Sequence, residues 1–185
     1  MTSGTTPAPP VDSREPSNAR SNVEDVLPLL ANQLALLLHR ERSIDDPGFL
    51  QVRYRLEGPH DVARYGQAWQ SAINRHPSLR TSIRARDDGN PLAIIWRHVD
   101  LPVVFEDWRS DSDQRIRFER LLRSDRDRGL DITVAPAMRL HLIRTQDETY
   151  EAVWTCHHLF VDGWSAAVVL EDVMALYAGA GGVAV

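Results

Sequence analysis

The chain has 185 residues, enough for one domain with a hydrophobic core, and its 43% of hydrophobic residues is ordinary for a globular protein. Its net charge of −5 argues against a general nucleic-acid binder, which usually presents a basic face. The single cysteine excludes an intrachain disulfide framework, and no apolar run is long enough to span a membrane.

The N-terminal segment, residues 1–22, consists mainly of Ser, Thr, Pro and charged residues. Such a composition cannot bury enough apolar surface to fold, so it predicts a disordered tail. The segment lacks the apolar centre of a secretory signal, which makes the cytoplasm the expected location. A solvated leader is the simpler interpretation, and a docking tail for an upstream protein is the alternative.

Leucines at helical spacing predict a first helix over Val23–His39, capped by Ser21 or Asn22. Its apolar face is formed by Leu27, Leu30, Leu34, Leu37 and Leu38. Pro28 falls early in this helix, where proline is tolerated. Gln33 interrupts the apolar face, and from the pattern alone it is interpreted as a solvent-facing position.

Alternating apolar residues predict a half-buried strand over Phe49–Glu57, and helical spacing predicts a helix over Val62–Arg75 that ends before Pro77. The next predicted strand, Leu79–Arg86, carries Arg80. If Arg80 points inward, it needs a carboxylate partner, because an unpaired buried charge is costly.

The remaining elements follow the same two periodicities. They are turns at 45–48 and 88–90, strands over Leu92–Arg97, Val103–Glu106, Pro136–Thr145 and Tyr150–Cys156, a charged helix over Asp111–Arg128 and a last helix over Ser165–Tyr177. The strands on either side of residues 146–148 are expected to pair through that turn. Together the elements predict a mixed α/β (α+β) sandwich, a mixed sheet with helices packed on one side.

A histidine pair stands where the last strand ends and the last helix is about to begin, in the sequence His157-His158-Leu159-Phe160-Val161-Asp162-Gly163-Trp164-Ser165. Because successive side chains of a strand point to opposite faces, one histidine should face the chemistry and the other should be packed. Asp162 either orients an imidazole or turns away and locks the loop by pairing with an arginine. Gly163 permits a tight turn and a close backbone approach. Since the sequence has no serine or cysteine elbow, we expect a lone histidine that acts on a nucleophile brought by the substrate.

No other residues form a recognisable chemical site. His39, His60, His76, His98 and His141 are scattered, and none forms a His-x₃-His pairing, so no metal site is predicted. Cys156 precedes the histidine pair, but its position in a strand favours a packing role over that of a nucleophile.

The nine-residue stretch resembles the His-His-x-x-x-Asp-Gly motif of the condensation domains of nonribosomal peptide synthetases. Arg75-His76-Pro77-Ser78-Leu79-Arg80-Thr81 is similar to the family's Arg-His-Glu/Pro-x-Leu-Arg-Thr motif, although Ile83 stands where the family often has Phe. Two further segments, from Leu27 to His39 and from Arg128 to Leu140, resemble the family's opening helix and its Pro-Phe-Asp-Leu…Pro-Pro-Leu-Arg segment. The four segments occur in family order.

The resemblance implies a chloramphenicol-acetyltransferase-like fold, of which residues 23–185 would be the N-terminal lobe with the second lobe absent. The chain would then be an excised piece, a truncated gene product or half of a split enzyme, and we expect it to be inactive without the second lobe. The resemblance also places the first helix beside the active-site tunnel, which gives Gln33 a second interpretation.

The implied activity is that of an acyltransferase that forms a peptide bond between two substrates carried on phosphopantetheine arms. The partners would be a donor and an acceptor carrier domain, with no cofactor bound directly, no metal, no nucleic acid and no membrane. The resemblance makes His158 the residue that positions the amine or accepts its proton, and it includes His157, Asp162 and Gly163 in the site. It also favours Arg80 over Arg75 as the arginine that pairs with Asp162.

Two other functions stay open. One is a non-catalytic lobe that docks carriers or another enzyme, which the missing second lobe favours and the intact motif opposes. The other is a different acyltransferase of the same superfamily, which would transfer acyl groups from coenzyme A or a carrier to a small alcohol or amine. The Trp164-Ser165 ending favours condensation.

Overall fold

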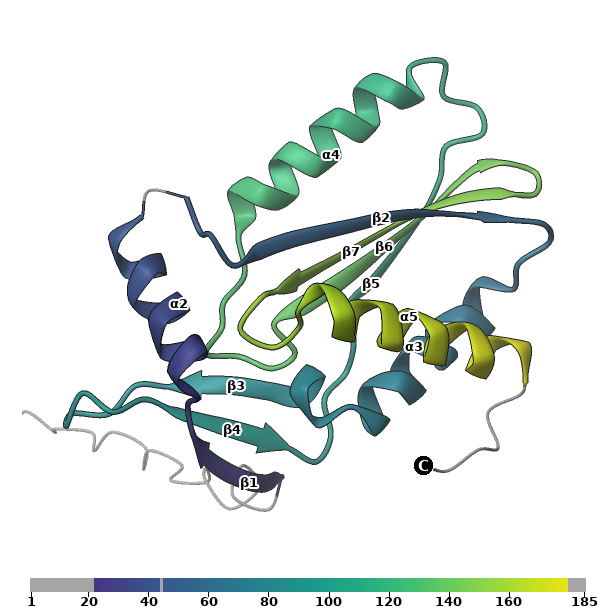
Figure 1. Ribbon diagram of the computed structural model, residues 1–185. Helices are drawn as coiled ribbons and strands as arrows, with labels where there is room; N and C mark the ends of the chain where they lie inside the picture. The colour runs from purple at the N-terminus through teal and green to yellow at the C-terminus, as the bar shows by residue number, and fades with distance from the viewer. Residues whose placement is uncertain (1–21, 44, 180–185) are drawn as a thin grey trace, which may run out of the picture.

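The computed structural model describes residues 22–43 and 45–179 (Figure 1). Its elements in chain order are β1 (Val23–Pro28), α2 (Ala31–Arg42), β2 (Phe49–Glu57), α3 (Val62–Arg75), the 3-10 helix η1 (Pro77–Arg80), β3 (Thr81–Arg84), β4 (Leu92–Trp96), β5 (Val103–Asp107), α4 (Gln114–Arg128), β6 (Met138–Gln146), β7 (Thr149–His157) and α5 (Gly163–Ala178). The predicted disordered tail, apart from Asn22, lies outside the described residues.

The strands form two sheets. The larger sheet has the order β2-β7-β6-β5, in which β7 pairs antiparallel with β2 and β6, while β5 and β6 are parallel. The smaller sheet has the order β1-β4-β3 and is antiparallel throughout. Strand β7 lies at the centre of the larger sheet and is buried along nearly its whole length. The strand that leads into the histidine pair is therefore the most rigidly enclosed strand of the molecule.

Helices cover both faces of the larger sheet (Figure 1). Helices α3 and α5 cover one face, where Trp69 of α3 packs edge-on against Trp154 of β7 with the ring centroids 5.0 Å apart. Helix α4 covers the other face, where Phe118 packs with Ile143 and Val153. The prediction that the helices lie on one side is therefore wrong. The physical reason is that β7 is buried on both faces: Val153, Thr155 and His157 lie on the second face and are fully buried, so this face needs a cover too.

The predicted first helix is wrong at its N-terminal end. Residues Val23–Pro28 form an edge strand that pairs with β4, and the helix begins only at Ala31. Proline lacks a backbone N–H and disfavours a helical conformation in the residue before it, whereas the end of an edge strand tolerates it. Likewise, the first part of the predicted strand Leu79–Arg86 is the 3-10 helix, and β3 begins at Thr81.

The fold class and most of the remaining elements are confirmed, whereas the division into a tail and an N-terminal lobe stays a prediction. The α/β class with a mixed sheet is correct, and β2 and α3 have the predicted bounds. The strands and helices from residue 92 onward lie within a few residues of their predicted positions. Within the described part of the chain, no helix is both long and apolar enough to cross a membrane.

Candidate functional site

The two histidines of the motif have opposite environments, as strand alternation predicts. His157 ends β7 with a fully buried side chain, whereas His158 begins the loop to α5 and is exposed. A cavity of about 360 Å³ lies between the N-terminal part of α2 and this loop, and His158 lines it together with Gln33 and Asp162. His158 is thus the histidine of the pair that can meet a substrate.

His157 is held by hydrogen bonds at both ring nitrogens. Its Nε2 lies 3.1 and 3.3 Å from the two carboxylate oxygens of Asp46, and its Nδ1 accepts a hydrogen bond of 3.1 Å from the Leu159 N–H. Burial lowers the pKa of His157, and this effect outweighs the opposing charge of Asp46. The ring is therefore neutral near pH 7 and serves as a fixed support rather than a proton carrier.

Asp46 and Gly48 are residues that sequence reasoning missed, because the sequence predicts only a turn over 45–48. Burial opposes ionisation of Asp46, but hydrogen bonds from Arg40 and the Gly48 N–H, with the charge of His157, lower its pKa below the ordinary value. Gly48 touches the same ring: a Cβ added to it would lie 2.3 Å from His157 Cε1. Only a glycine fits there, and no spacing in the sequence reveals this contact between residues more than a hundred positions apart.

Gln33 faces the site rather than solvent. Its Nε2 donates a 2.9 Å hydrogen bond to the Leu159 carbonyl, and its Oε1 accepts one of 2.9 Å from the Leu30 N–H. The side chain therefore connects the start of α2 to the loop that carries His158. This contact agrees with the interpretation that the helix lies beside the site, and the active-site tunnel itself stays a prediction.

Among the residues that the structure describes, Asp162 pairs with no arginine, and the predicted Arg80–Asp162 bridge is wrong. Asp162 instead caps α5: its Oδ1 accepts hydrogen bonds from the Ser165 N–H at 2.7 Å and the Ser165 hydroxyl at 2.6 Å. These bonds lower the pKa of Asp162. A carboxylate at the first residue before a helix finds unpaired amides close by, which explains this choice of partner.

Arg80 and Arg75 find other carboxylates. Arg80 is buried as expected and does have an acidic partner, but the partner is Glu24, 2.7 Å away. Its guanidinium also donates to the carbonyls of Ile73 and Trp96, which ties α3 to the smaller sheet. Arg75 pairs at 2.7 Å with Asp172 of α5. Both arginines therefore support the framework around the loop, not the loop itself.

Gly163 is the first residue of α5, and its backbone does not require glycine. Its φ is not positive, and a Cβ at this position would meet no described atom within 4 Å. The interpretation as a tight turn is therefore wrong. The open space beside its backbone is consistent with the predicted close approach of another molecule.

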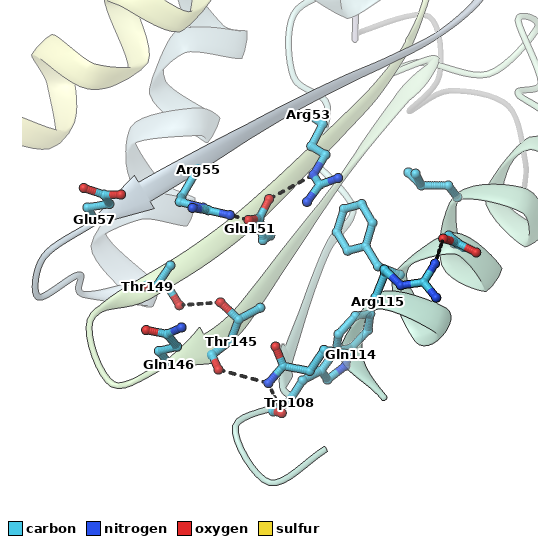
Figure 2. Close-up of a pocket in the computed structure, with 13 residues that line it drawn as sticks. Arg53, Arg55, Glu57, Trp108, Gln114, Arg115, Thr145, Gln146, Thr149 and Glu151 are labelled. Atoms are coloured by element: carbon cyan, nitrogen blue, oxygen red, sulfur yellow. Dashed lines mark hydrogen bonds and ion pairs between the residues drawn. The ribbon is translucent and has the colours of Figure 1, made fainter. Parts of the chain in front are cut away.

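A second cavity, of about 610 Å³, lies on the α4 side of the larger sheet (Figure 2). Arg53 and Arg55 of β2 point to the same buried carboxylate, that of Glu151 on β7, each at 2.9 Å, and Arg115 pairs with Glu119. Three arginines and three glutamates line this cavity, so their formal charges cancel: Arg53, Arg55, Arg115, Glu57, Glu119 and Glu151. None of the predicted site residues lines it.

The remaining chemistry-bearing groups are arranged for packing. Burial raises the pKa of the Cys156 thiol to about 12, so the reactive thiolate is suppressed and the predicted packing role is supported. Among the residues that the structure describes, no group of three or more His, Cys, Asp or Glu side chains is placed to hold a metal ion.

Comparison with known proteins gives one consistent family. A family model described as "Condensation domain" matches residues 23–182. A linear gramicidin synthase of Brevibacillus parabrevis is 33% identical over 159 residues, which are 84% of this chain and 2% of that protein. Bacitracin synthase 3 of Bacillus licheniformis is 31% identical over 159 residues, which are 85% of this chain and 2% of that protein.

Solved structures agree with these relatives. The starter condensation domain of rhizomide synthetase superposes with a TM-score of 0.75 at 19% identity, over 85% of this chain and 38% of that chain. The tallysomycin biosynthesis protein TlmII superposes with a TM-score of 0.73 at 26% identity, over 84% of this chain and 38% of that chain. The chain therefore spans less than half of the solved chains that it matches.

Proposed function

This chain belongs to the condensation-domain family, and from that premise we propose that residues 23–185 act as the N-terminal lobe of a nonribosomal peptide synthetase condensation domain. The reaction is amide-bond formation between a carrier-bound aminoacyl or peptidyl thioester and a carrier-bound amine. The observation that carries the proposal is the exposure of His158 in a cavity while its neighbour His157 is buried and neutral. The site thus offers one imidazole, and no competing nucleophile lines the cavity except the Ser165 hydroxyl, which is bonded to Asp162.

The proposed step moves one acyl group and one proton. The acceptor amine attacks the thioester carbonyl, the C–N bond forms, the C–S bond breaks, and the proton lost by the amine ends on the departing thiol. His158 positions the amine or accepts its proton, a role that an imidazole fulfils near neutral pH. The substrates arrive on phosphopantetheine arms of carrier domains, so the chain itself needs to bind no cofactor for this step.

The developing negative charge on the carbonyl oxygen needs a donor nearby. The amides of the first turn of α5 have no acceptor within the helix, and the helix dipole favours an anion at this end. The Ser165 amide is engaged by Asp162, so we assign the donor role to the amide of Gly163, a residue with open space beside its Cα. Holding both tethered substrates in this geometry supplies much of the expected acceleration.

The partners follow from the same proposal. Two carrier domains deliver the substrates, and a second condensation lobe supplies the other wall of the tunnel. The chain presents apolar surface that such a lobe would cover, with Trp164 83% exposed and Leu30 66% exposed beside the cavity region. We therefore propose that the chain is inactive without the second lobe.

The decisive experiment combines the chain with its second lobe and two loaded carriers and measures dipeptide by mass spectrometry. Wild type should form product, and His158→Ala should lower the rate about 10²- to 10⁴-fold. The exposed His98→Ala is the matched control and should leave the rate unchanged. Equal rates for wild type and His158→Ala would contradict a catalytic role of His158. Carrier binding without product in any variant would favour the non-catalytic docking lobe.

A further inference from the structure

The short segment Asp46–Gly48, which leads into β2, encloses the buried histidine of the motif. The Asp46 carboxylate and the Gly48 Cα lie against the His157 ring, and the Gly48 carbonyl accepts a hydrogen bond from the His158 N–H. The segment is separated from the motif by more than a hundred residues, and nothing in the proposed reaction uses it. The proposed reaction therefore does not explain why this segment contacts the motif.

The hydrogen bonds of His157 define a single state of its ring. An ionised carboxylate can only accept, so the ring nitrogen that faces Asp46, Nε2, carries the proton. The Leu159 N–H can only donate, so Nδ1 carries the lone pair. His157 is thus held as the neutral Nε2–H tautomer between a carboxylate and a backbone amide.

The loop that presents His158 is held by hydrogen bonds to His157 and to Gly48. Four consecutive amides, those of residues 158–161, donate to only these two residues. The His158 N–H donates to the Gly48 carbonyl at 2.7 Å, the Leu159 N–H to His157 Nδ1 at 3.1 Å, and the amides of residues 160 and 161 to the His157 carbonyl at 3.0 and 3.3 Å. A rotation of the His157 ring would remove one of these bonds and release the backbone beside His158.

Asp46 also connects the loop to helix α2. Its Oδ2 accepts a 2.7 Å hydrogen bond from Arg40 Nε near the end of α2, and its Oδ1 accepts one of 2.9 Å from the Gly48 N–H. One carboxylate therefore joins the last turns of α2, the entry to β2 and the ring of His157. The other part of α2, through Gln33, holds the same loop from the cavity side.

We infer that Asp46 is a positioning residue: it fixes the His157 ring in one tautomer and orientation, and through that ring and Gly48 it holds the loop that presents His158. The effect on catalysis rests on the proposed function, whereas the effect on the ring and the loop does not. Asp46 touches neither substrate nor reacting atoms in this scheme.

The first test uses the ¹⁵N-labelled chain and does not depend on activity. Ring ¹⁵N shifts should show His157 as the neutral Nε2–H form in wild type, and Asp46→Ala should abolish that single form. Amides 158–161 should exchange with solvent at least about tenfold faster in Asp46→Ala, while amides of β7 remain protected. Asp46→Asn keeps an acceptor oxygen and should preserve both signatures. Asp45→Ala removes an exposed carboxylate one residue away and should change neither.

The second test measures rates in the reconstituted reaction with the second lobe and loaded carriers. Asp46→Ala should lower kcat about tenfold to a hundredfold, the size of effect produced by a misplaced group, with KM little changed. Asp46→Asn should recover most of the rate, and Asp45→Ala should match wild type. A change in KM alone, with kcat unaltered, would not fit a positioning role and would overturn it.

The two tests separate the failure of this inference from that of the proposed function. Unchanged His157 signals and unchanged exchange of amides 158–161 in Asp46→Ala overturn the inference, whatever the activity. Changed signals with an unchanged rate overturn the link to catalysis. If wild type forms no product, the proposed function fails, and the ring and exchange measurements still decide whether Asp46 positions the loop.

Discussion

Asp162 caps the first turn of α5 instead of pairing with an arginine, so its removal should affect the stability of that helix. Asp162→Ala takes away the cap of α5 and should lower the melting temperature by about 2–4 °C, the usual effect of a lost cap in a chain of this size. Asp162→Asn retains a capping oxygen and should melt close to wild type. A much larger fall in the melting temperature, of the size seen when a buried ion pair is broken, would contradict the capping role. Thermal unfolding followed by circular dichroism measures the difference.

One buried carboxylate that does pair with an arginine is Asp125 of α4. Arg139 of β6 donates to it, and Thr155 of β7 donates to its other oxygen at 2.5 Å. Burial opposes its ionisation, but His141, whose Nε2 lies 3.8 Å from Oδ1, and the hydrogen bonds from Thr155 and Arg139 outweigh burial and hold the pKa of Asp125 far below its usual range. Asp125→Asn should therefore lower the free energy of unfolding at pH 7 by about 3–5 kcal/mol, because Arg139 is left buried without its counter-charge.

The same carboxylate should make stability depend on pH. A pKa that is lower in the folded than in the unfolded chain stabilises the fold fully above the unfolded value, about 3.9, and the contribution is lost as the pH falls below it. The gap in unfolding free energy between wild type and Asp125→Asn should therefore begin to narrow near about pH 4, the unfolded value, and keep narrowing as the pH falls toward the much lower pKa of the folded chain. Urea unfolding at each pH measures it. The exposed Asp127→Asn is the control, and a gap that stays constant with pH would refute the assignment.

At the residue scale, the sequence predicted the histidine pair but not its partners. Strand alternation predicts that one histidine is packed and the other faces the chemistry, because it depends only on local geometry. The assignment of the site to His158 came from the resemblance, not from alternation. The partners of Arg80 and Asp162 depend on which distant carboxylates and amides the fold brings near. The helical pattern of the leucines extends over Glu24, which hides its role as the partner of Arg80.

At the scale of elements, α2 is the least enclosed helix of the site. Although the structure describes all twelve of its residues, none is buried, so hydrogen bonds from Gln33 and Arg40 have an unusual share in holding it. Gln33→Ala should raise the exchange rates of α2 amides while lowering global stability by no more than about 1.5 kcal/mol, the net worth of one hydrogen bond. Native-state hydrogen exchange measures this. Glu41→Ala, an exposed change on the same helix, should leave the rates unchanged, and equal rates in both variants would show that Gln33 is not a tether.

Elements with a strong pattern were predicted with their correct bounds, and elements defined by distant pairing were not. Strand β2 alternates cleanly and α3 has a marked apolar face, so local periodicity suffices for both. Strand β1 exists because it pairs with β4, which is distant in the sequence, and the leucines that follow it extend the helical pattern over it. That α4 covers the second face of the sheet is likewise a matter of tertiary packing, because the β7 residues on that face include Glu151 and Thr155 besides Val153 and form no continuous apolar pattern.

At the scale of the whole molecule, the exposed apolar side chains indicate which surface the proposed second lobe would cover. Trp164 lies one turn from Val168 on α5, and their exposed fractions are 83% and 42%. A tryptophan of this exposure is rare on a surface that faces only water, and it is a common anchor of interfaces. Trp69, Trp108 and Trp154 are buried and Trp96 is half-buried, so a quencher in solution reaches Trp164 more easily than the other four tryptophans.

Iodide quenching of tryptophan fluorescence can therefore report the association directly. Adding the second condensation lobe should protect Trp164 and reduce the quenchable fraction. Trp164→Phe should have a small quenchable fraction with or without the lobe. This result would show that Trp164 is the residue whose fluorescence iodide quenches. Trp164→Ala should weaken the association about tenfold or more, as expected for an anchor residue worth at least about 1.4 kcal/mol. If a complex forms, as seen by size-exclusion chromatography, and iodide still quenches Trp164 fully, then this end of α5 lies outside the interface and the second lobe covers a different surface.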